Sequence, residues 1–179
     1  MEDPFRLADR LAKHQALELY RRRRVVAQPA GATVVSDDRT LKNFCSNDYL
    51  GLTQHPQLVA AAELALKSYG VGSGASHLVT GHTQIHHQLE ERLADWVGRP
   101  RALLFSTGYM ANLGAISALA RRGDCVIQDR LNHASLLDGA QLSRAALRRY
   151  RHCDVEDLSR CLESSEETPE AARLVVTDS

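Results

Sequence analysis

Two turns in the sequence carry residues that could bind or transform a small molecule. In the first, Ser106–Met110, two hydroxyl residues and a glycine stand where an apolar run gives way to an expected helix. Backbone N–H groups at a helix start have no intrahelical partner and favour anions, and Gly108 would let an anion approach the backbone closely. The turn is therefore a candidate phosphate site, although strand–glycine–helix turns are common and most bind nothing.

The second turn, Asp129–Ser135, places His133 just before another expected helix. An imidazole in that position could stack on a flat heteroaromatic ring or transfer a proton near neutral pH. A single loop histidine is more often a surface hydrogen-bonding residue. The residue types alone leave both interpretations open.

The glycine-rich segment Gly70–Ser76 suggests a nucleotide loop at first sight, but other features argue against this. No Gly-Lys-Ser/Thr follows it, its spacing is not that of a dinucleotide loop, and it follows an expected helix instead of a strand. We therefore expect neither ATP nor NAD here. A mobile or close-packed loop near a ligand or a partner chain fits the composition better.

Histidines and cysteines give no metal-site pattern in the sequence. The histidines cluster, but no carboxylate or cysteine stands at the spacing of a zinc protease, so solvated positions are expected. No C-x-x-C pair occurs, which favours reduced, structural or surface thiols. The residues concerned are His77, His82, His86, His87, Cys45, Cys125, Cys153 and Cys161.

The charge balance argues against nucleic acid and membrane partners. Lys plus Arg and Asp plus Glu both number 22, so no net field attracts polyanions. The basic run Arg21–Arg24 lacks interleaved aromatic residues, and one arginine facing a substrate carboxylate explains it more simply. The acidic start Met1–Pro4 is not followed by an apolar segment, and no stretch of 18 apolar residues occurs. We therefore expect a cytoplasmic protein.

Hydrophobic periodicity predicts an α/β fold, a mainly parallel sheet with helices on both faces. In such sheets ligands bind beyond the carboxyl ends of the strands, which is where both chemical turns fall. Expected strands are Ala102–Phe105, Cys125–Gln128, Leu147–Tyr150 and Leu174–Thr177, and expected helices alternate with them near Tyr109–Leu119, Ser135–Ser143 and Asp154–Leu162. Earlier in the chain we expect helices over Phe5–Arg22, Pro56–Gly70 and Thr83–Val97, and a hairpin of Ala32–Val35 with Leu41–Phe44.

Three ordered segments, Phe44–Leu52, Gly72–His82 and Leu131–Gly139, closely resemble the α-oxoamine synthases, which are fold-type-I enzymes that use pyridoxal phosphate (PLP). The resemblance extends from the first helix to the last residues. It implies that residues 1–45 form an N-terminal helix and hairpin segment. Residues 46–179 would be the first, incomplete part of the PLP-binding large domain.

Within this family, the chain is most similar to members that condense L-alanine with a pimeloyl thioester. This similarity lies in Arg21 ahead of Val26–Gln28 and in the residues of the segment Asn132–Asp138. In that reaction carbon dioxide and the free thiol carrier, either CoA or acyl-carrier protein, are released. Glycine-using relatives such as aminolevulinate synthase and 2-amino-3-ketobutyrate CoA ligase share many of these residues, as does serine palmitoyltransferase. A non-catalytic partner subunit is a further alternative. The family also implies a homodimer.

The resemblance assigns roles to individual residues. Backbone groups of Gly108 and Tyr109 would hold the PLP phosphate, and His133 would stack on the pyridine ring and lie against the substrate. Arg21 would contact substrate, and Asn47 would bind the amino-acid carboxylate. The catalytic lysine that forms a Schiff base with PLP lies further along the family pattern, so no catalytic residue is expected within this chain. We therefore expect the 179 residues alone to be inactive.

Overall fold

The structure is a computed structural model that describes residues 3–26, 31–164 and 171–178. It consists of two units, Met1–Gly72 and Ser73–Ser179, and each is described by itself. The predicted division of the chain after residue 45 stays a prediction. Among the described residues, none of the helices combines the length and hydrophobicity that crossing a bilayer requires.

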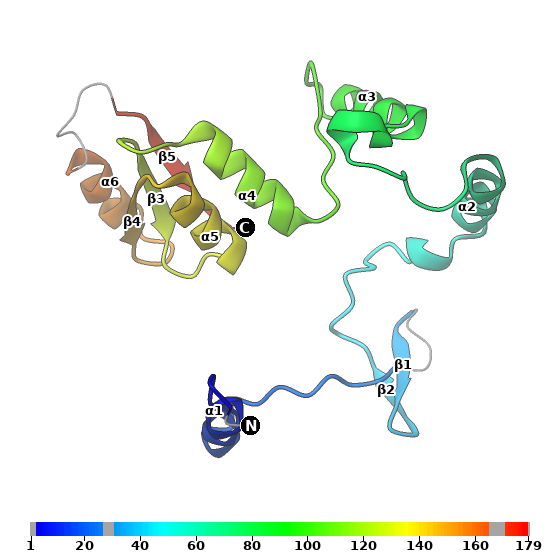
Figure 1. Ribbon diagram of the computed structural model, residues 1–179, viewed down its shortest axis with the longest axis horizontal. Coiled ribbons are helices and arrows are strands. Elements are labelled where there is room, and N and C mark those ends of the chain that lie inside the picture. Colours follow the sequence, from blue (N-terminus) through cyan, green and yellow to red (C-terminus); the bar gives the residue numbers. More distant parts are fainter. Residues whose placement is uncertain (1–2, 27–30, 165–170, 179) are drawn as a thin grey trace. The chain divides into compact units, whose positions relative to one another are not determined.

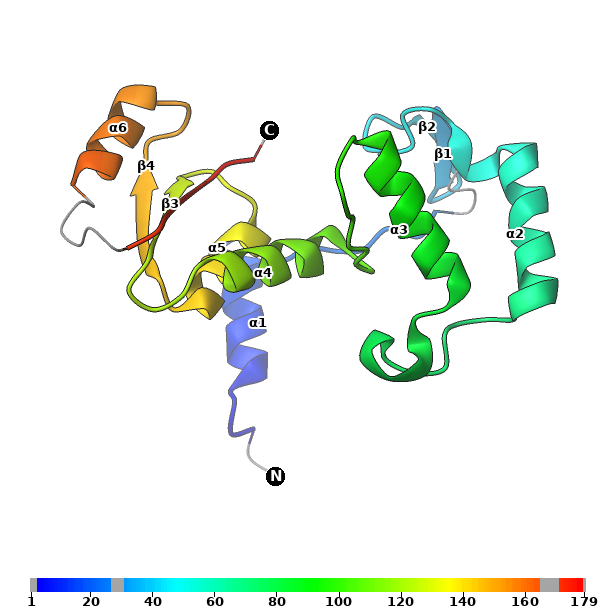
Figure 2. The same cartoon turned by 90° about the horizontal axis from the view of Figure 1, so that it is seen from above.

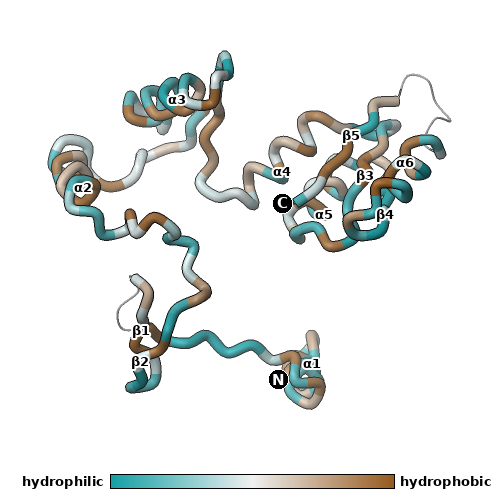
Figure 3. Tube along the Cα trace, turned by 180° about the vertical axis from the view of Figure 1, so that it is seen from behind, coloured by the Kyte–Doolittle hydropathy of each residue, from teal (hydrophilic) through white to brown (hydrophobic). Residues whose placement is uncertain are grey.

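The first unit contains helix α1, a hairpin, a short 3-10 helix (Leu52–Gln54) and helix α2 (Figure 1). Helix α1 (Leu7–Ala16) is shorter than the predicted helix, because Glu18 has a φ of 56° that ends the helical turn. The basic run Arg21–Arg24 follows it and forms part of the hydrophilic stretch after α1 in Figure 3. Helix α2 (Pro56–Tyr69) begins and ends where proline and glycine predict.

The hairpin joins β1 (Thr33–Ser36) to β2 (Arg39–Lys42) in antiparallel register, with Ser36 opposite Arg39. The two linking residues, Asp37 and Asp38, have φ values of 51° and 57°. Two consecutive left-handed residues form the tight turn whose twist matches that of paired strands, and aspartate tolerates this conformation. The predicted hairpin is therefore confirmed, with each strand displaced by one or two residues.

The second unit contains helix α3 (Gln84–Trp96) and then an alternating run of helices and strands (Figure 2). Strand β3 lies between β4 and β5, and both pairs are parallel. This confirms the predicted parallel α/β architecture. The elements after α3 are α4 (Gly108–Leu119), β3 (Cys125–Asp129), α5 (Ala134–Ser143), β4 (Ala146–Tyr150), α6 (Val155–Glu163) and β5 (Arg173–Val176).

Every residue of the central strand β3 is buried, because helices cover both faces of the sheet. Successive strand residues point to opposite faces. Val126 packs in one cluster with Ile116 of α4 and Leu136 of α5, whereas Ile127 packs in another with Leu158 of α6. Helices α4 and α5 therefore cover one face and α6 covers the other, as the sequence predicts.

Asp124 fixes the turn before β3. Its carboxylate accepts the backbone N–H of Arg121 at 2.9 Å and that of Ala172 at 3.0 Å. These two hydrogen bonds hold the pKa of Asp124 below its usual value, in spite of the partial burial that opposes them. The contact with Ala172 aligns the start of β5 beside β3.

The predicted strand Ala102–Phe105 does not form, and this prediction was wrong. A strand requires a neighbour that takes up its backbone hydrogen bonds, and no strand of the described residues pairs with this segment. The Leu104 N–H instead donates to the Glu90 carboxylate at 2.8 Å. Leu103 is 74% exposed, so the apolar run is an extended segment and not a buried strand.

Candidate functional site

The N-terminus of α4 presents two backbone N–H groups to the surface. Thr107 caps the helix, and its side-chain oxygen accepts the N–H of Met110 at 3.1 Å. The Ala111 N–H bonds to the Thr107 carbonyl oxygen. The N–H groups of Gly108 and Tyr109 have no hydrogen-bond partner among the described residues, and both residues are exposed. The positive end of the helix dipole adds to their attraction for an anion.

Space around Gly108 suits close approach of a bound group. A Cβ atom built on Gly108 would meet no atom within 4 Å. The glycine is therefore not demanded by packing inside the protein, and a phosphate oxygen could reach the backbone from this open side. The sequence prediction of a phosphate turn fits this local geometry.

His133 stands at the carboxyl end of the turn after β3 and caps α5. Its ring Nδ1 accepts the N–H of Ser135 at 3.2 Å, so the neutral ring carries its proton on Nε2. The backbone N–H of His133 donates to the Asp178 carboxylate at 3.0 Å, which connects this turn to the end of β5. The residue is exposed, so one face of the imidazole can meet a ligand.

Two polar side chains beneath His133 fix the orientation of its ring. The amide nitrogen of Asn112 donates to the Ser135 hydroxyl at 2.9 Å, and that hydroxyl lies 2.7 Å from His133 Nδ1. Ser135 is fully buried, so its hydroxyl can accept from Asn112 and donate to the imidazole without competition from water. This relay links α4, which begins in the Ser106–Met110 turn, to the histidine.

The structure brings two of the sequence-predicted residues together. The rings of Tyr109 and His133 lie edge to face, with centroids 6.2 Å apart and an interplanar angle of 77°. The Tyr109 hydroxyl donates a hydrogen bond to the carboxylate of Asp138 on α5. That hydrogen bond, with smaller contributions from burial and the carboxylate charge, raises the pKa of Tyr109 above its usual value. The phenol therefore stays protonated to a higher pH than an ordinary tyrosine does.

A third polar residue, Asn132, ties this turn to the last strand. Its amide nitrogen donates to the Val176 carbonyl oxygen at 2.9 Å, and its amide oxygen accepts the Asp178 N–H at 3.0 Å. Asn132 is buried, so both bonds form away from bulk water. The turn that carries His133 is thus held at both the β3 and β5 strand ends.

Sequence reasoning missed the supporting residues Asn112, Asp138 and Asp178. Asn112 lies about one helical turn after Gly108, and Asp138 lies about one helical turn after His133. The signal that could have identified them is a polar residue within a mainly apolar helix. Asp178 gives no such signal, because it meets His133 only through the parallel pairing of β3 with β5.

The two predicted substrate contacts lie in the first unit. Arg21 is an exposed residue of the extended segment after α1, and Asn47 is exposed with its side-chain oxygen 3.4 Å from the Tyr49 hydroxyl. Their roles stay predictions.

Asp129, the last residue of β3, is a further charged group at this edge. Its carboxylate accepts the N–H of Leu131 at 2.8 Å and that of Cys153 at 3.0 Å, and it pairs with His152. The Leu131 hydrogen bond, helped by those of Cys153 and His152, holds the pKa of Asp129 below its usual value against the opposing effect of burial.

Three of the clustered histidines, His77, His82 and His87, are exposed, as expected for solvated positions, and histidines of the cluster also contact one another. The Nδ1 atoms of His77 and His82 are 3.1 Å apart, and the rings of His77 and His86 lie edge to face at 4.7 Å. His86 also completes a capping box with Thr83 at the start of α3. This capping role accounts for one of the four histidines structurally.

Comparison with known proteins places these turns in a wider context. A model of the family aminotransferase class I and II matches residues 39–179. The 8-amino-7-oxononanoate synthase of Methylococcus capsulatus is 59% identical over 172 residues, which are 96% of this chain and 43% of that protein. The 8-amino-7-oxononanoate synthase of Pseudomonas putida KT2440 is 56% identical over 174 residues, which are 97% of this chain and 44% of that protein. The chain thus spans less than half the length of these relatives.

Solved structures show the same fold. Serine palmitoyltransferase from S. paucimobilis, with a bound PLP–myriocin aldimine, superposes with a TM-score of 0.86 and 36% identity, covering 97% of this chain and 45% of that one. The 8-amino-7-oxononanoate synthase of Francisella tularensis superposes with a TM-score of 0.57 and 37% identity, covering 65% of this chain and 32% of that one.

Proposed function

The chain belongs to the aminotransferase class I and II family, and on that premise we propose that it is the cofactor-holding part of an 8-amino-7-oxononanoate synthase. That enzyme condenses L-alanine with a pimeloyl thioester to give 8-amino-7-oxononanoate, carbon dioxide and the free thiol carrier in biotin biosynthesis. The main support is that the Gly108 and Tyr109 N–H groups, which have no hydrogen-bond partner among the described residues, lie on the same helix start as the Tyr109 ring that contacts His133.

The residues present fit PLP. The N–H groups of Gly108 and Tyr109 would hold the phosphate at the positive end of α4, and His133 would lie against the pyridine ring. When bound, PLP supplies an electron sink that stabilises a carbanion at the amino-acid α-carbon. The open space above Gly108 and the exposed imidazole are the local features that favour this assignment.

The residues of the chain would contribute orientation and charge placement to the reaction. Asn112 and Ser135 hold the imidazole with Nδ1 occupied and Nε2–H free to donate to a substrate oxygen. The uncharged side chain of Tyr109, which is hydrogen-bonded to Asp138, would lie beside the pyridine ring of PLP. Arg21 and Asn47 would bind carboxylate groups through charge-assisted hydrogen bonds. Fixed geometry of this kind lowers the entropic cost of reaching the transition state.

The choice of amino-acid and thioester substrates follows from which relatives the chain is most similar to. The curated relatives that are 56–59% identical are named oxononanoate synthases, whereas the serine palmitoyltransferase structure is 36% identical. We therefore favour L-alanine and a pimeloyl thioester over serine and a palmitoyl thioester. A cytoplasmic homodimer is part of the same proposal, with either CoA or acyl-carrier protein as the thiol carrier.

A substrate panel tests the proposal. The complete polypeptide that contains this chain is offered L-alanine, glycine or L-serine with pimeloyl-CoA and with palmitoyl-CoA, and products are identified by mass spectrometry. We expect the alanine–pimeloyl pair to give the highest kcat/KM. A preference for glycine would assign the chain to a glycine-using relative, and a preference for serine with palmitoyl-CoA would assign it to a palmitoyltransferase.

A further inference from the structure

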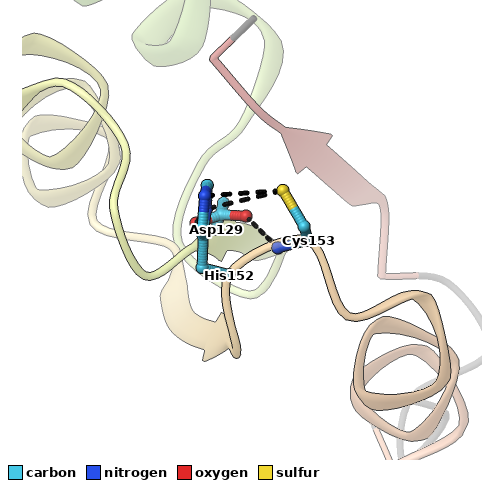
Figure 4. A group of neighbouring side chains, drawn as sticks. All are labelled: Asp129, His152 and Cys153. Atoms are coloured by element: carbon cyan, nitrogen blue, oxygen red, sulfur yellow. Dashed lines mark hydrogen bonds and ion pairs between the residues drawn. The ribbon is translucent and has the colours of Figure 1, made fainter.

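Three side chains of different donor type meet where β3 and β4 end, and the proposed function uses none of them. Asp129 closes β3, and His152 and Cys153 lie in the turn after β4 (Figure 4). One ligand atom from each lies within 4.8 Å of the others. The group combines carboxylate oxygen, imidazole nitrogen and thiol sulfur.

Distances within this Asp129–His152–Cys153 group resemble the edges of a tetrahedral zinc site. His152 Nδ1 lies 3.0 Å from Asp129 Oδ1 and 3.7 Å from Cys153 Sγ. With ordinary zinc bond lengths, ligand atoms in a tetrahedron are separated by about 3.4 Å for nitrogen and oxygen and about 3.6 Å for nitrogen and sulfur. The third separation, between the Asp129 carboxylate and Cys153 Sγ, is within 4.8 Å, so the His152 and Cys153 side chains must rotate to bring all three atoms onto one ion.

The backbone already holds the three donors in place. The N–H of Cys153 donates to Asp129 Oδ2 at 3.0 Å, and Cys153 has a left-handed φ of 55°. The Asp129 side chain is only 6% exposed, whereas that of His152 is 56% exposed. One of the three side chains is thus buried, and the other two are exposed to solvent.

We propose that Asp129, His152 and Cys153 form a binding site for a divalent zinc-class cation, with three protein ligands and one open position. A thiolate–imidazole–carboxylate set selects zinc over magnesium and calcium, which prefer oxygen ligands alone. Binding releases the thiol proton of Cys153 to water. It also breaks the hydrogen bond between His152 Nδ1 and Asp129, and the neutral imidazole then carries its proton on Nε2 while Nδ1 binds the ion. The ion would clamp the β4 turn to the end of β3. The Leu131 N–H, two residues before His133, bonds to the same Asp129 carboxylate.

Cobalt difference spectra test this site in the complete polypeptide. Co²⁺ is titrated into the chelator-treated protein, and the sulfur-to-cobalt charge-transfer band is recorded against the metal-free sample. This band reports only a cysteine ligand, so cobalt held by the contacting histidines His77 and His82 does not contribute. We expect one saturable band per chain, and we expect Zn²⁺ to bleach it.

Variants separate this group from other thiols. Cys153→Ser should abolish the band, and His152→Gln should weaken the apparent Co²⁺ affinity at least tenfold. Cys45→Ser is the matched control, because Cys45 is also an exposed free cysteine, and it should leave the band unchanged. Asp129 is left intact because it also holds backbone groups, and thermal unfolding verifies that each variant is folded.

Two results would overturn the proposal. One is the absence of a saturable thiolate–cobalt band in the folded wild-type protein. The other is a band that survives Cys153→Ser or disappears with Cys45→Ser, since either would place the metal on another cysteine.

Discussion

Gly139 controls how closely α4 and α5 approach, and replacing it should destabilise the second unit. A Cβ atom at this position would lie 3.0 Å from Ile116 Cδ1 and 3.1 Å from the Asn112 carbonyl oxygen. The isoleucine side chain can rotate, but the carbonyl belongs to the helix backbone and cannot move without shifting α4. Overpacking of this kind costs about 1–3 kcal/mol.

Helix propensity opposes this cost, because alanine is favoured over glycine inside a helix by about 0.8–1 kcal/mol. For Gly139→Ala we therefore expect a net destabilisation of about 1 kcal/mol. Gly139→Val adds two more methyl groups and a β-branched side chain, so it should exceed the alanine variant by at least about 1 kcal/mol.

Denaturant or thermal unfolding of the complete polypeptide measures these changes. Gly108→Ala is the matched control for stability, since a Cβ at the start of α4 meets nothing within 4 Å and should therefore not lower the unfolding free energy. A Gly139→Ala protein that is more stable than wild type would refute the argument. It would mean that propensity outweighs the contact with the Asn112 carbonyl.

Three further predictions concern ionisation and the histidine relay. The pKa of Tyr109 is raised, so spectrophotometric titration should find one tyrosine with a high pKa, and this pKa should return toward the ordinary tyrosine value in Asp138→Asn. The hydrogen bond to Asp138 stabilises the fold below the ordinary tyrosine pKa, and this stabilisation is lost as pH rises through the pKa of the folded protein. The pKa of Asp124 is lowered, so its two backbone hydrogen bonds stabilise the fold above the ordinary aspartate pKa, and this stabilisation is lost as pH falls through the pKa of Asp124 in the folded protein. In Asp124→Asn the free energy of unfolding should therefore depend less on pH in the acidic range. Ser135→Ala removes a fully buried hydroxyl from the relay and should lower the free energy of unfolding by about 1–3 kcal/mol. Equilibrium titration should also show weaker PLP binding, because His133 loses the hydrogen bond that orients its ring. Unchanged stability and PLP affinity would show that the relay is dispensable.

Local signals predicted most of the elements correctly. Pro56 and Gly70 mark the ends of α2 because they act on their own backbone, and the alternation of apolar runs predicts the parallel pairing of β3, β4 and β5. The sequence also predicted correctly that the Ser106–Met110 turn and His133 each stand at the start of a helix, whereas their roles toward PLP stay predictions.

Features that depend on distant partners were not predictable in this way. The run Ala102–Phe105 has the composition of a strand, but strand formation depends on a neighbour that its own residues do not reveal. Asp129 and His152 are 23 residues apart, and they meet because the parallel register sets Asp129 opposite Tyr150, two residues before His152. Such contacts follow from the pairing of strands and not from spacing along the chain.

The most direct test of the proposed cofactor site is a crystal structure of the complete polypeptide with PLP. We predict that the phosphate oxygens lie within hydrogen-bonding distance of the backbone nitrogens of Gly108 and Tyr109, with the imidazole of His133 stacked on the pyridine ring. A phosphate bound away from the N-terminus of α4, or a pyridine ring that does not contact His133, would contradict the assignment.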